Sequence, residues 1–325
     1  MITAFRNLST VQRETGPSMG DPVSRFFFAG RHAVCELPRV AGTGATCYQG
    51  RMHHVIADPG TLIPRIERVL YARTAESAIF TAAAEDLPTA SAVLLPLGRL
   101  AEAGAVETCL ILNKRSLRVR QPGDLCCPGG SVSPRFDWHA SRLIGWPFFP
   151  LGRWPFWQRW RRERPGEARW LALYLSTALR EGFEEMRINP LRVRFLGPLP
   201  PQRLVLFRRL IYPMAVWIPH QERFRPSWEV QRIVKIPLRR LLEPSNYVRY
   251  RLRMELPRAT AGAEQTSEHP GFCLPAADGP EVLWGATYRM TMAFLNIVFG
   301  FAPPAPEHLP IVSASLGATY PTGEG

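Results

Sequence analysis

The stretch Arg180-Glu181-Gly182-Phe183-Glu184-Glu185 places three carboxylates within six residues, inside the longer segment Ser176–Ile188. The run from Trp170 to Ile188 has no proline and one glycine, and it is rich in Leu, Ala, Glu and Arg. These residues favour a helix. The glutamates are spaced i, i+3 and i+4, so a helix would carry all three on one face within about one turn.

Two interpretations of this acidic face are open. Neighbouring carboxylates repel one another unless a cation lies among them. Hard divalent cations prefer oxygen ligands, and Mg²⁺ commonly combines one or two carboxylates with substrate phosphates. The alternative is a solvated acidic surface with Arg180 and Arg187 as local partners. The glutamate spacing by itself does not choose between them.

Composition and charge narrow the classes of protein and partner. The chain has 325 residues, of which 46% are hydrophobic and 10% aromatic, enough for a sizeable core in one large or two smaller domains. A net charge of +13 favours an anionic partner, such as a polyphosphate, a nucleic acid or an acidic membrane surface. Net charge does not distinguish these partners, and the oligomeric state is left open.

Cysteine usage and hydropathy predict the compartment. None of the six cysteines forms a C-x-x-C motif, so we expect ordinary thiols in a reducing environment. No apolar run approaches about 18 residues, which argues against a transmembrane helix. The N-terminus lacks the apolar core of a signal peptide. We therefore expect a cytoplasmic protein, with peripheral membrane contact as an added hypothesis.

Hydrophobic patterning divides the chain into a compact middle with looser ends. We expect an ill-defined N-terminal extension over 1–60, a main domain over 61–302, and a Pro-rich disordered tail over 303–325. Helices are predicted near 62–73 and over 281–299, a helical turn at 238–242 and a polar loop at 256–271. Strands are predicted at 91–97, 107–113, 193–197, 210–218 and 229–238.

Residues 131–169 form an unusual segment that is aromatic, interrupted by proline and then basic. Trp146-Pro-Phe-Phe-Pro-Leu-Gly-Arg-Trp-Pro-Phe-Trp157 leads into Gln158-Arg-Trp-Arg-Arg-Glu-Arg164. One hypothesis is membrane contact through 146–164, since Trp and Arg suit headgroup depth. A second is a stacking surface for single-stranded nucleic acid. The third is an insertion whose aromatic residues pack on the parent domain.

The glycine loop that precedes the acidic helix helps to choose between the two interpretations of its carboxylates. Leu112-Asn-Lys-Arg-Ser116, then Arg120, Gly123 and Cys127-Pro-Gly-Gly130, followed by R-E-x-x-E-E at 180–185, resembles the signature of coenzyme A pyrophosphatases in the Nudix family. The likeness extends over roughly residues 88–300. It implies a mixed α/β fold, in which a mixed β-sheet lies between helices and the acidic helix packs on one face.

Three departures from the motif stand out. Gly130 and Arg180 are 50 positions apart, roughly 36 more than in the motif, and the excess is the aromatic insertion. The first motif glutamate is absent: its position is Phe136 when counted forward from Gly130, and Ala172 when counted back from Arg180. Asp137 lies one position after Phe136 and is a candidate substitute. Arg187 replaces the late glycine, so Asn189-Pro190 is expected to end the helix.

The resemblance implies metal-dependent hydrolysis of a diphosphate in a nucleoside diphosphate derivative. It makes Glu181, Glu184 and Glu185 ligands of Mg²⁺ or Mn²⁺, with Glu184 also catalytic. Arg180 would orient the glutamates. Glu229 is the candidate base or extra ligand, with Glu281 as the second choice.

The basic loop and the glycines supply the expected substrate contacts. Gly129 and Gly130 would let main chain approach the metal site, and the loop arginines would bind further phosphates, such as the 3′-phosphate of coenzyme A: Arg115, Arg118 and Arg120. The expected substrate is coenzyme A or an acyl derivative, cleaved to a phosphopantetheine and adenosine 3′,5′-bisphosphate, with no nucleic-acid partner. The alternatives are another nucleoside diphosphate derivative, or a weakly catalytic scaffold that binds a nucleotide or a membrane.

Overall fold

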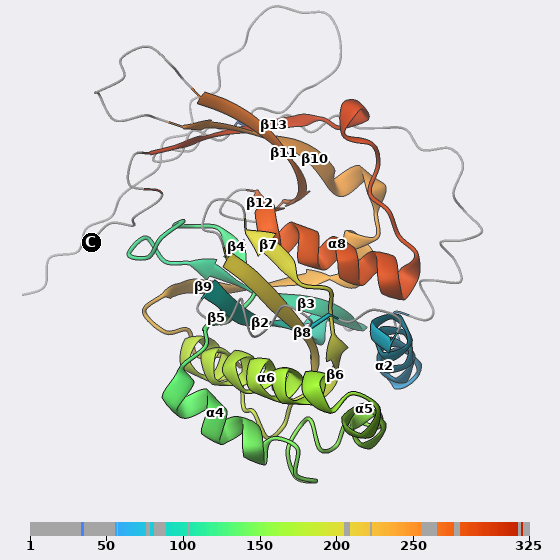
Figure 1. The fold of residues 1–325 in the computed structure, drawn as a ribbon. Helices are drawn as coiled ribbons and strands as arrows, with labels where there is room; N and C mark the ends of the chain where they lie inside the picture. Colours follow the sequence, from blue (N-terminus) through green and yellow to red (C-terminus); the bar gives the residue numbers. More distant parts are fainter. Residues whose placement is uncertain are drawn as a thin grey trace, which may run out of the picture.

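The computed structural model describes residues 34–35, 56, 58–75, 79–80, 89–102, 105–204, 209–221, 223–254, 265–275, 280–317 and 320. Most of the N-terminal extension expected at 1–60 therefore lies outside the described residues. Two β-sheets and the helices around them make up the described part of the chain (Figure 1).

The central sheet has eight strands and mixed pairing. Its main path runs β4-β3-β2-β8-β6, while β5 pairs with β2, β7 with β8 and β9 with β3. Among the described strands of this sheet, β2 and β8 are the one pair in parallel. The strands are β2 (Ala90–Glu102), β3 (Ala105–Arg115), β4 (Leu125–Cys126), β5 (Gly129–Ser131), β6 (Arg194–Pro198), β7 (Gln202–Leu204), β8 (Arg209–Ile218) and β9 (Val230–Pro237).

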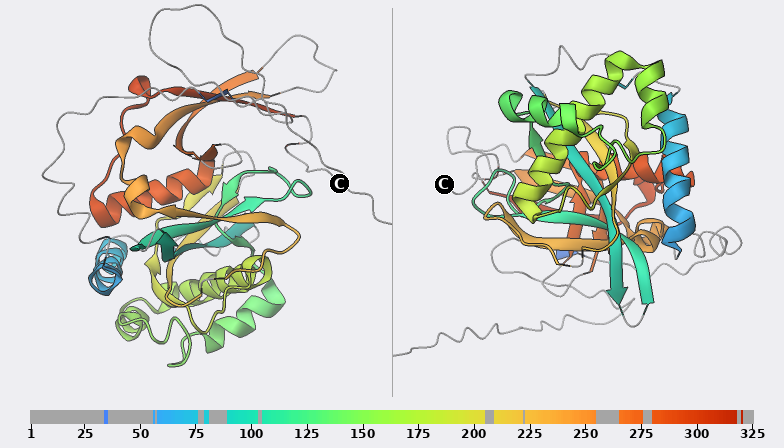
Figure 2. Two further views of the ribbon diagram at one scale, coloured as in Figure 1. Left: turned by 180° about the vertical axis from the view of Figure 1, so that it is seen from behind. Right: turned by 90° about the horizontal axis from the view of Figure 1, so that it is seen from below.

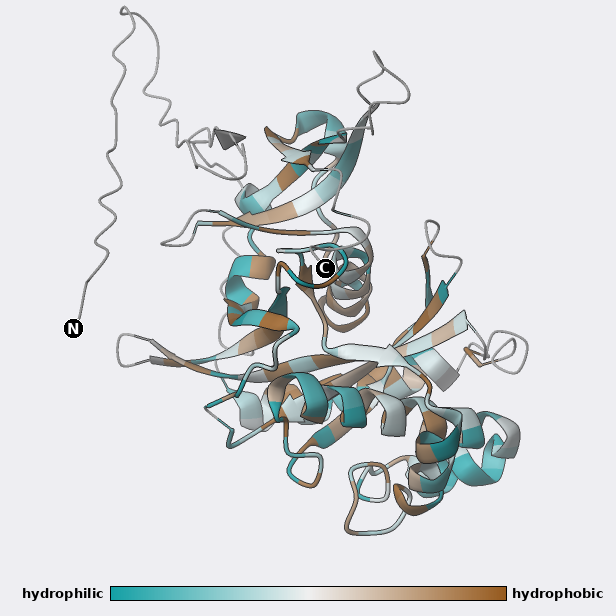
Figure 3. Cartoon of the chain, turned by 90° about the vertical axis from the view of Figure 1, so that its left-hand side faces the viewer, coloured by the Kyte–Doolittle hydropathy of each residue, from teal (hydrophilic) through white to brown (hydrophobic). Residues whose placement is uncertain are grey.

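Alternation along β2 explains why helices cover both faces of this sheet. Val93, Leu95 and Leu97 join one hydrophobic core, whereas Ala92 and Leu94 join the other. Successive side chains of a strand point to opposite faces of the sheet. A strand with apolar residues on both faces must therefore be covered by other elements on both sides. Figure 3 shows hydrophobic residues gathered in the central layer of strands, with hydropathy alternating along the helices. The prediction of a mixed sheet between helices is confirmed.

One core lies between the central sheet and helices α2 (Pro59–Ala75) and α8 (Gly285–Phe299). The other lies under α6 (Pro165–Met186), with α4 (Pro134–Leu143) and α5 (Trp157–Glu163) beside it. Viewed from below, these three helices form a layer over the sheet (Figure 2). A short helix, α7 (Leu238–Leu241), follows β9. No helix in the described ranges is long and apolar enough to cross a membrane.

The acidic helix is longer than predicted, and it ends differently. It begins at Pro165, five residues before Trp170, because proline suits the first helical turn. It ends at Arg187, whose φ of 57° and ψ of 37° are left-handed. The Arg187 amide then donates to the carbonyls of Gly182 and Phe183. The expectation that Asn189-Pro190 would end the helix is therefore wrong.

The 131–169 insertion leaves the central sheet continuous. It supplies α4, a turn over 144–156, α5 and the first residues of α6, which pack together beside the sheet. Trp154, Trp157 and Trp160 are buried in the core under α6. For these three tryptophans, packing on the parent domain is the interpretation that the structure supports.

A second, five-stranded sheet was not predicted. Its order is β1-β13-β10-β11-β12, with β10 and β13 parallel. The strands are β1 (Val34–Cys35), β10 (Tyr247–Met254), β11 (Gln265–Leu274), β12 (Glu281–Trp284) and β13 (Ile311–Leu316), with single 3₁₀ turns at Pro244–Asn246 and Pro306–His308. Figure 1 shows α8 between the two sheets.

Three expectations for the C-terminal third are corrected by this sheet. The polar loop predicted at 256–271 is strand from Gln265 onward, and the helix predicted from Glu281 starts only at Gly285, after β12. The tail predicted to be disordered from 303 contains β13. The buried Tyr320 hydroxyl donates to Asp124 at 2.5 Å, which fixes the described end of the chain against the β3–β4 loop.

The cysteines with described side chains are free, as predicted. Burial raises the pKa of Cys109 to about 12 and raises that of Cys127 well above its ordinary value. Both groups therefore stay protonated at neutral pH and are poor nucleophiles or metal ligands.

Candidate active site

Glu185 is the most buried carboxylate of the acidic helix. Its two oxygens accept hydrogen bonds from the Asn113 side-chain amide on β3 and from the Gly129 main-chain amide, the latter at 3.4 Å. Burial raises the pKa of Glu185 to about 8, and the negative charges of Glu181 and Glu229 add to the rise. Among the described side chains, no Lys, Arg or His forms an ion pair with Glu185. Glu185 is therefore a partly buried acid without an ion-pair partner among the described side chains, and Arg115 is the cation that opposes the rise of its pKa.

Glu181 lies against the glycine strand β5. A Cβ atom placed on Gly130 would come 2.4 Å from a Glu181 carboxylate oxygen, so only glycine leaves room for this carboxylate. A Cβ on Gly129 would meet the Ala92 carbonyl oxygen at 2.4 Å. Burial raises the pKa of Glu181, and the neighbouring Arg180 opposes that rise. The Pro-Gly-Gly sequence thus brings main chain close to two carboxylates.

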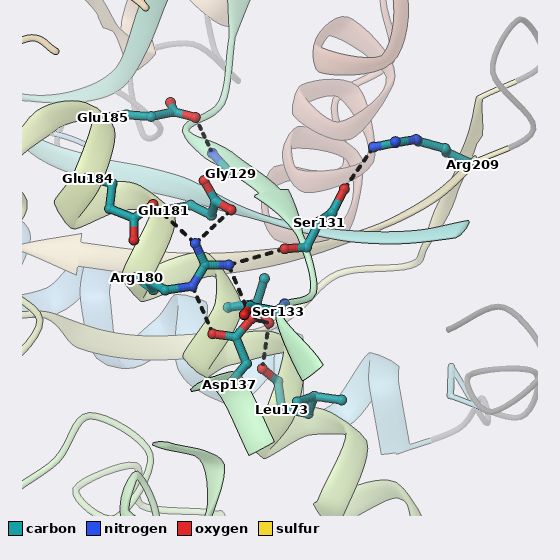
Figure 4. Close-up of polar contacts among 11 residues, drawn as sticks. Gly129, Ser131, Ser133, Asp137, Leu173, Arg180, Glu181, Glu184, Glu185 and Arg209 are labelled. Atoms are coloured by element: carbon teal, nitrogen blue, oxygen red, sulfur yellow. Dashed lines mark hydrogen bonds and ion pairs between the residues drawn. The ribbon is translucent and has the colours of Figure 1, made fainter. Parts of the chain in front are cut away.

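Arg180 connects the acidic helix to the insertion. Its Nε and Nη2 atoms donate to Asp137 at 2.9 and 3.1 Å, while Nη1 contacts Glu181 at 2.9 Å and Glu184 at 3.1 Å. Figure 4 shows the guanidinium at the centre of this network. The hydrogen bonds that Arg180 donates to Asp137 raise the pKa of Arg180, so it stays charged. A planar guanidinium held at both edges fixes the carboxylates around it.

Asp137 supplies the carboxylate that the motif alignment places at Phe136 or Ala172. Phe136 is exposed, whereas Asp137 is fully buried in the first turn of α4. It also accepts from the Thr177 hydroxyl at 2.9 Å and from the Ser133 amide at 2.7 Å. Its oxygens are thus occupied by donors from α4 and α6. The suggestion that Asp137 could bind metal is corrected: it positions Arg180.

The remaining predicted carboxylates lie in different environments. Glu184 is exposed and contacts Arg180. Glu229 is exposed at the start of β9 and close enough to Glu185 to raise its pKa. Glu281 is buried in an ion-pair cluster with Lys114, at 3.1 Å, and Arg232. Glu229 is therefore near the acidic helix, whereas Glu281 is occupied by cations.

The three predicted phosphate-binding arginines are not equivalent. Arg115 lies near enough to Glu185 to oppose the rise of its pKa, and its Nε donates to the Arg120 carbonyl at 2.7 Å. The side chains of Arg118 and Arg120 are exposed on the β3–β4 loop. The structure thus brings Arg115 to the carboxylates and leaves the other two at the loop surface.

A basic cavity that the sequence did not indicate adjoins the acidic helix. It has a volume of about 630 Å³ and is lined by Arg223, Phe224, Arg225, Ile233 and Lys235. The loop that supplies its arginines is attached to the end of α6, because the Arg225 amide donates to the Met186 carbonyl at 3.1 Å. Ile233 pairs in the sheet with Asn113, which contacts Glu185. The cavity therefore places cations and an aromatic ring next to the carboxylates.

The donor set fits a hard divalent cation. Glu181, Glu184 and Glu185 offer only oxygen ligands, and desolvation raises the pKa of Glu185 more than the Gly129 amide and Arg115 lower it. Within the described ranges no three His, Cys, Asp or Glu side chains already form a metal cluster. Glu184, held by Arg180 and otherwise exposed, is the carboxylate that would rotate to complete the set.

The residues missed by sequence reasoning come from segments distant along the chain. Asn113 is 72 positions from Glu185, and the basic cavity is lined by a loop and by β9. Asn113 lies in β3 after a strongly apolar run, where a lone amide is a signal for a buried polar contact.

Comparisons with known proteins gave structural matches only. Neither a scan against protein-family models nor a search of curated proteins matched the chain. Similar solved structures include an Ap4A hydrolase of C. elegans, with 16% identity over 46% of this chain and 80% of that one and a TM-score of 0.29. A Nudix hydrolase from Alicyclobacillus acidocaldarius has 14% identity over 47% and 81%, with a TM-score of 0.32.

A third match is the Nudix domain of Shewanella oneidensis NrtR, crystallised with ADP ribose, which has 12% identity over 47% of this chain and 75% of that one and a TM-score of 0.28. Each match covers just under half of this chain. Because these identities and TM-scores are low, the function proposed below rests on the residues of this chain.

Proposed function

We propose that this protein is a metal-dependent hydrolase of the Nudix type that cleaves the diphosphate bond of a nucleoside diphosphate derivative. The observation that carries the proposal is Glu185. It is a partly buried carboxylate whose pKa is raised to about 8 by desolvation, with Glu181 and Glu229 adding to the rise and Arg115 opposing it, and no described side chain forms an ion pair with it. Burying like charges together is unfavourable, and a divalent cation would relieve it. Such a cation would also bind substrate phosphates.

Glu181, Glu184 and Glu185 would hold Mg²⁺ or Mn²⁺. When bound, the cation supplies charge neutralisation on the diphosphate and lowers the pKa of a coordinated water. Arg180 keeps Glu181 oriented and is itself fixed by Asp137. Glu229, which is exposed and near Glu185, would accept a proton from an attacking water.

The substrate-binding role falls to the cations around the carboxylates. Arg115 would contact the diphosphate or a neighbouring phosphate, and Gly129 and Gly130 leave space for close approach. Arg118 and Arg120 lie on the adjoining loop, where they would meet outlying phosphates. The cavity formed by Arg223, Phe224 and Arg225 suits a further phosphate and a stacked base.

Coenzyme A or an acyl derivative is our preferred substrate. The segment 112–130 carries the residues that resemble coenzyme A pyrophosphatases. Coenzyme A also has a third phosphate beyond its diphosphate, and the site has separate cationic groups on the β3–β4 loop and in the cavity. The products would be a phosphopantetheine and adenosine 3′,5′-bisphosphate.

The test is a hydrolysis assay with Mg²⁺ or Mn²⁺ and a substrate panel of coenzyme A, NADH, ADP-ribose and a dinucleoside polyphosphate, followed by chromatography. We expect turnover by the wild type, a loss of at least about 100-fold in Glu185→Gln, and full activity in Glu307→Gln, a matched control at an exposed glutamate. Turnover of another substrate of the panel, without turnover of coenzyme A, would support the hydrolase and reject coenzyme A as its substrate. No turnover of any substrate, or equal rates in wild type and Glu185→Gln, would reject the hydrolase.

A further inference from the structure

We propose that the 131–169 insertion docks the protein onto an anionic phospholipid surface. In this arrangement Leu143, Trp146 and Phe148 enter the membrane interface, and three arginines beside them bind lipid phosphates: Arg142, Arg161 and Arg169. The surface is independent of the hydrolase proposed above.

Burial restricts which aromatic residues can take part. Trp154, Trp157 and Trp160 are buried, so contact through the whole of 146–164 is excluded in this conformation. Trp146 is 56% exposed and Phe148 is 79% exposed. Phe148 is the most exposed of the large hydrophobic residues described. The exposed large hydrophobic side chains of the insertion are thus Phe136 at the start of α4 and Leu143, Trp146 and Phe148 at and after its end.

This turn is held rigidly by main-chain hydrogen bonds and by its own anchors. The Trp146 amide donates to the Leu143 carbonyl at 2.9 Å, and the Phe149 amide to the Trp146 carbonyl at 3.0 Å. Ile144 and Leu151 on either side are buried in the core under α6. Leu143 itself is 43% exposed. A turn that is anchored at both sides presents its apolar side chains outward without unfolding, as an interfacial anchor requires.

A cationic cavity opens beside the exposed turn. It has a volume of about 650 Å³, and its lining includes Trp138, Trp146 and Trp157 together with Arg142, Arg161 and Arg169. No Asp or Glu lines it. In the described part of the chain none of the three arginines forms an ion pair, and Arg161 has only a hydrogen bond to Gln158, at 3.0 Å. Unpaired guanidinium groups around a hollow complement phosphate charge.

A polar atom inside this cavity lacks a partner. The indole Nε1 of Trp157 is buried and has no hydrogen-bond acceptor, although Trp157 lines the cavity. A buried donor without an acceptor is unfavourable. This atom has no accessible surface and does not contact a ligand; the arginines that line the cavity would neutralise a lipid phosphate.

The arrangement favours a membrane over single-stranded nucleic acid. Stacking proteins present successive aromatic faces along a groove. Here Trp138 already packs edge-on against Trp170, and the exposed rings sit on one turn. The cavity reaches Ala172 on α6, eight residues before Arg180, so it lies roughly 12 Å along the helix from the catalytic arginine. Docking therefore leaves the hydrolase site uncovered.

Vesicle co-sedimentation tests the proposal with full-length protein. Wild type should bind vesicles of phosphatidylglycerol and phosphatidylcholine and should bind phosphatidylcholine alone far more weakly. Trp146→Ser/Phe148→Ser should reduce partitioning by about tenfold or more, because serine removes the apolar ring surface that the membrane interface would bury. Arg142→Gln/Arg169→Gln should reduce it by about 30-fold.

Matched controls separate this surface from general charge and hydrophobicity. Arg65→Gln/Arg68→Gln on α2 removes the same charge, and Val106→Ser/Leu117→Ser removes exposed apolar side chains elsewhere. Both controls should bind like wild type. The proposal is overturned if wild type does not bind anionic vesicles, or if the controls lose as much binding as the test variants. It is also overturned if Trp146→Ser/Phe148→Ser loses affinity for single-stranded oligonucleotide while keeping vesicle binding.

Discussion

Replacing Asp137 by alanine should destabilise the protein by about 3 kcal/mol. Asp137 is fully buried and accepts four hydrogen bonds, two from Arg180 and one each from Thr177 and Ser133. Removing one partner of a buried ion pair costs about 3–5 kcal/mol, because the other charge stays desolvated. In Asp137→Ala the Nη1 atom of Arg180 would still contact Glu181 and Glu184, so the charge would keep two partners and the lower end of this range applies.

A double-mutant cycle measures whether the loss comes from the pair itself. Urea unfolding would be followed by tryptophan fluorescence for wild type, Asp137→Ala, Arg180→Met and the double variant. Arg180→Met leaves Asp137 buried without a cation, so each single variant should lose about 3 kcal/mol. The double variant should be more stable than the sum of both losses predicts, by about 2 kcal/mol.

Two results would refute this reasoning. A loss below about 1 kcal/mol in Asp137→Ala would mean that the pair behaves as an exposed surface salt bridge. Additive losses in the double variant would mean that Asp137 acts through the start of α4 and not through Arg180. In either case Asp137 would not position the guanidinium.

Three further predictions concern the carboxylates and the C-terminal strand. The pKa of Glu185 is raised from 4.5 to about 8, so between these pH values the folded metal-free protein keeps a proton that the unfolded chain loses. The stability gained by Glu185→Gln over wild type should therefore grow from about pH 4.5 to pH 8 and stay constant above, and a gain that is independent of pH would contradict the raised pKa. Gly130→Ala should lower hydrolysis by about 100-fold with an unchanged circular dichroism spectrum, because the new Cβ displaces the Glu181 carboxylate; wild-type rates would show that Glu181 is not needed there. Tyr320→Phe should lower the free energy of unfolding by about 1–2 kcal/mol, because the charged Asp124 carboxylate loses a hydrogen bond; no change in a denaturant titration would mean that Tyr320 is not docked.

Local pattern was enough to predict the five longest strands of the central sheet and the presence of the acidic helix. The apolar runs at 91–97, 107–113 and 210–218 all lie within strands, because residues buried on both faces must be apolar throughout. The spacing of Glu181, Glu184 and Glu185 on one helical turn follows from the period of the helix alone. The second sheet escaped prediction because β12 and β13 are short and lie among loop and proline residues, so their strand conformation depends on the neighbours β11 and β10.

The sequence by itself determined that three carboxylates share a helical face, and that a Pro-Gly-Gly loop precedes them. Only the tertiary structure decided which carboxylate positions Arg180 and which one has its pKa raised without an ion-pair partner among the described side chains. Asp137 reaches Arg180 across 43 residues, and Asn113 reaches Glu185 across 72. Such contacts depend on how α4, α6 and β3 pack, and packing is set by long-range burial that no local residue pattern encodes.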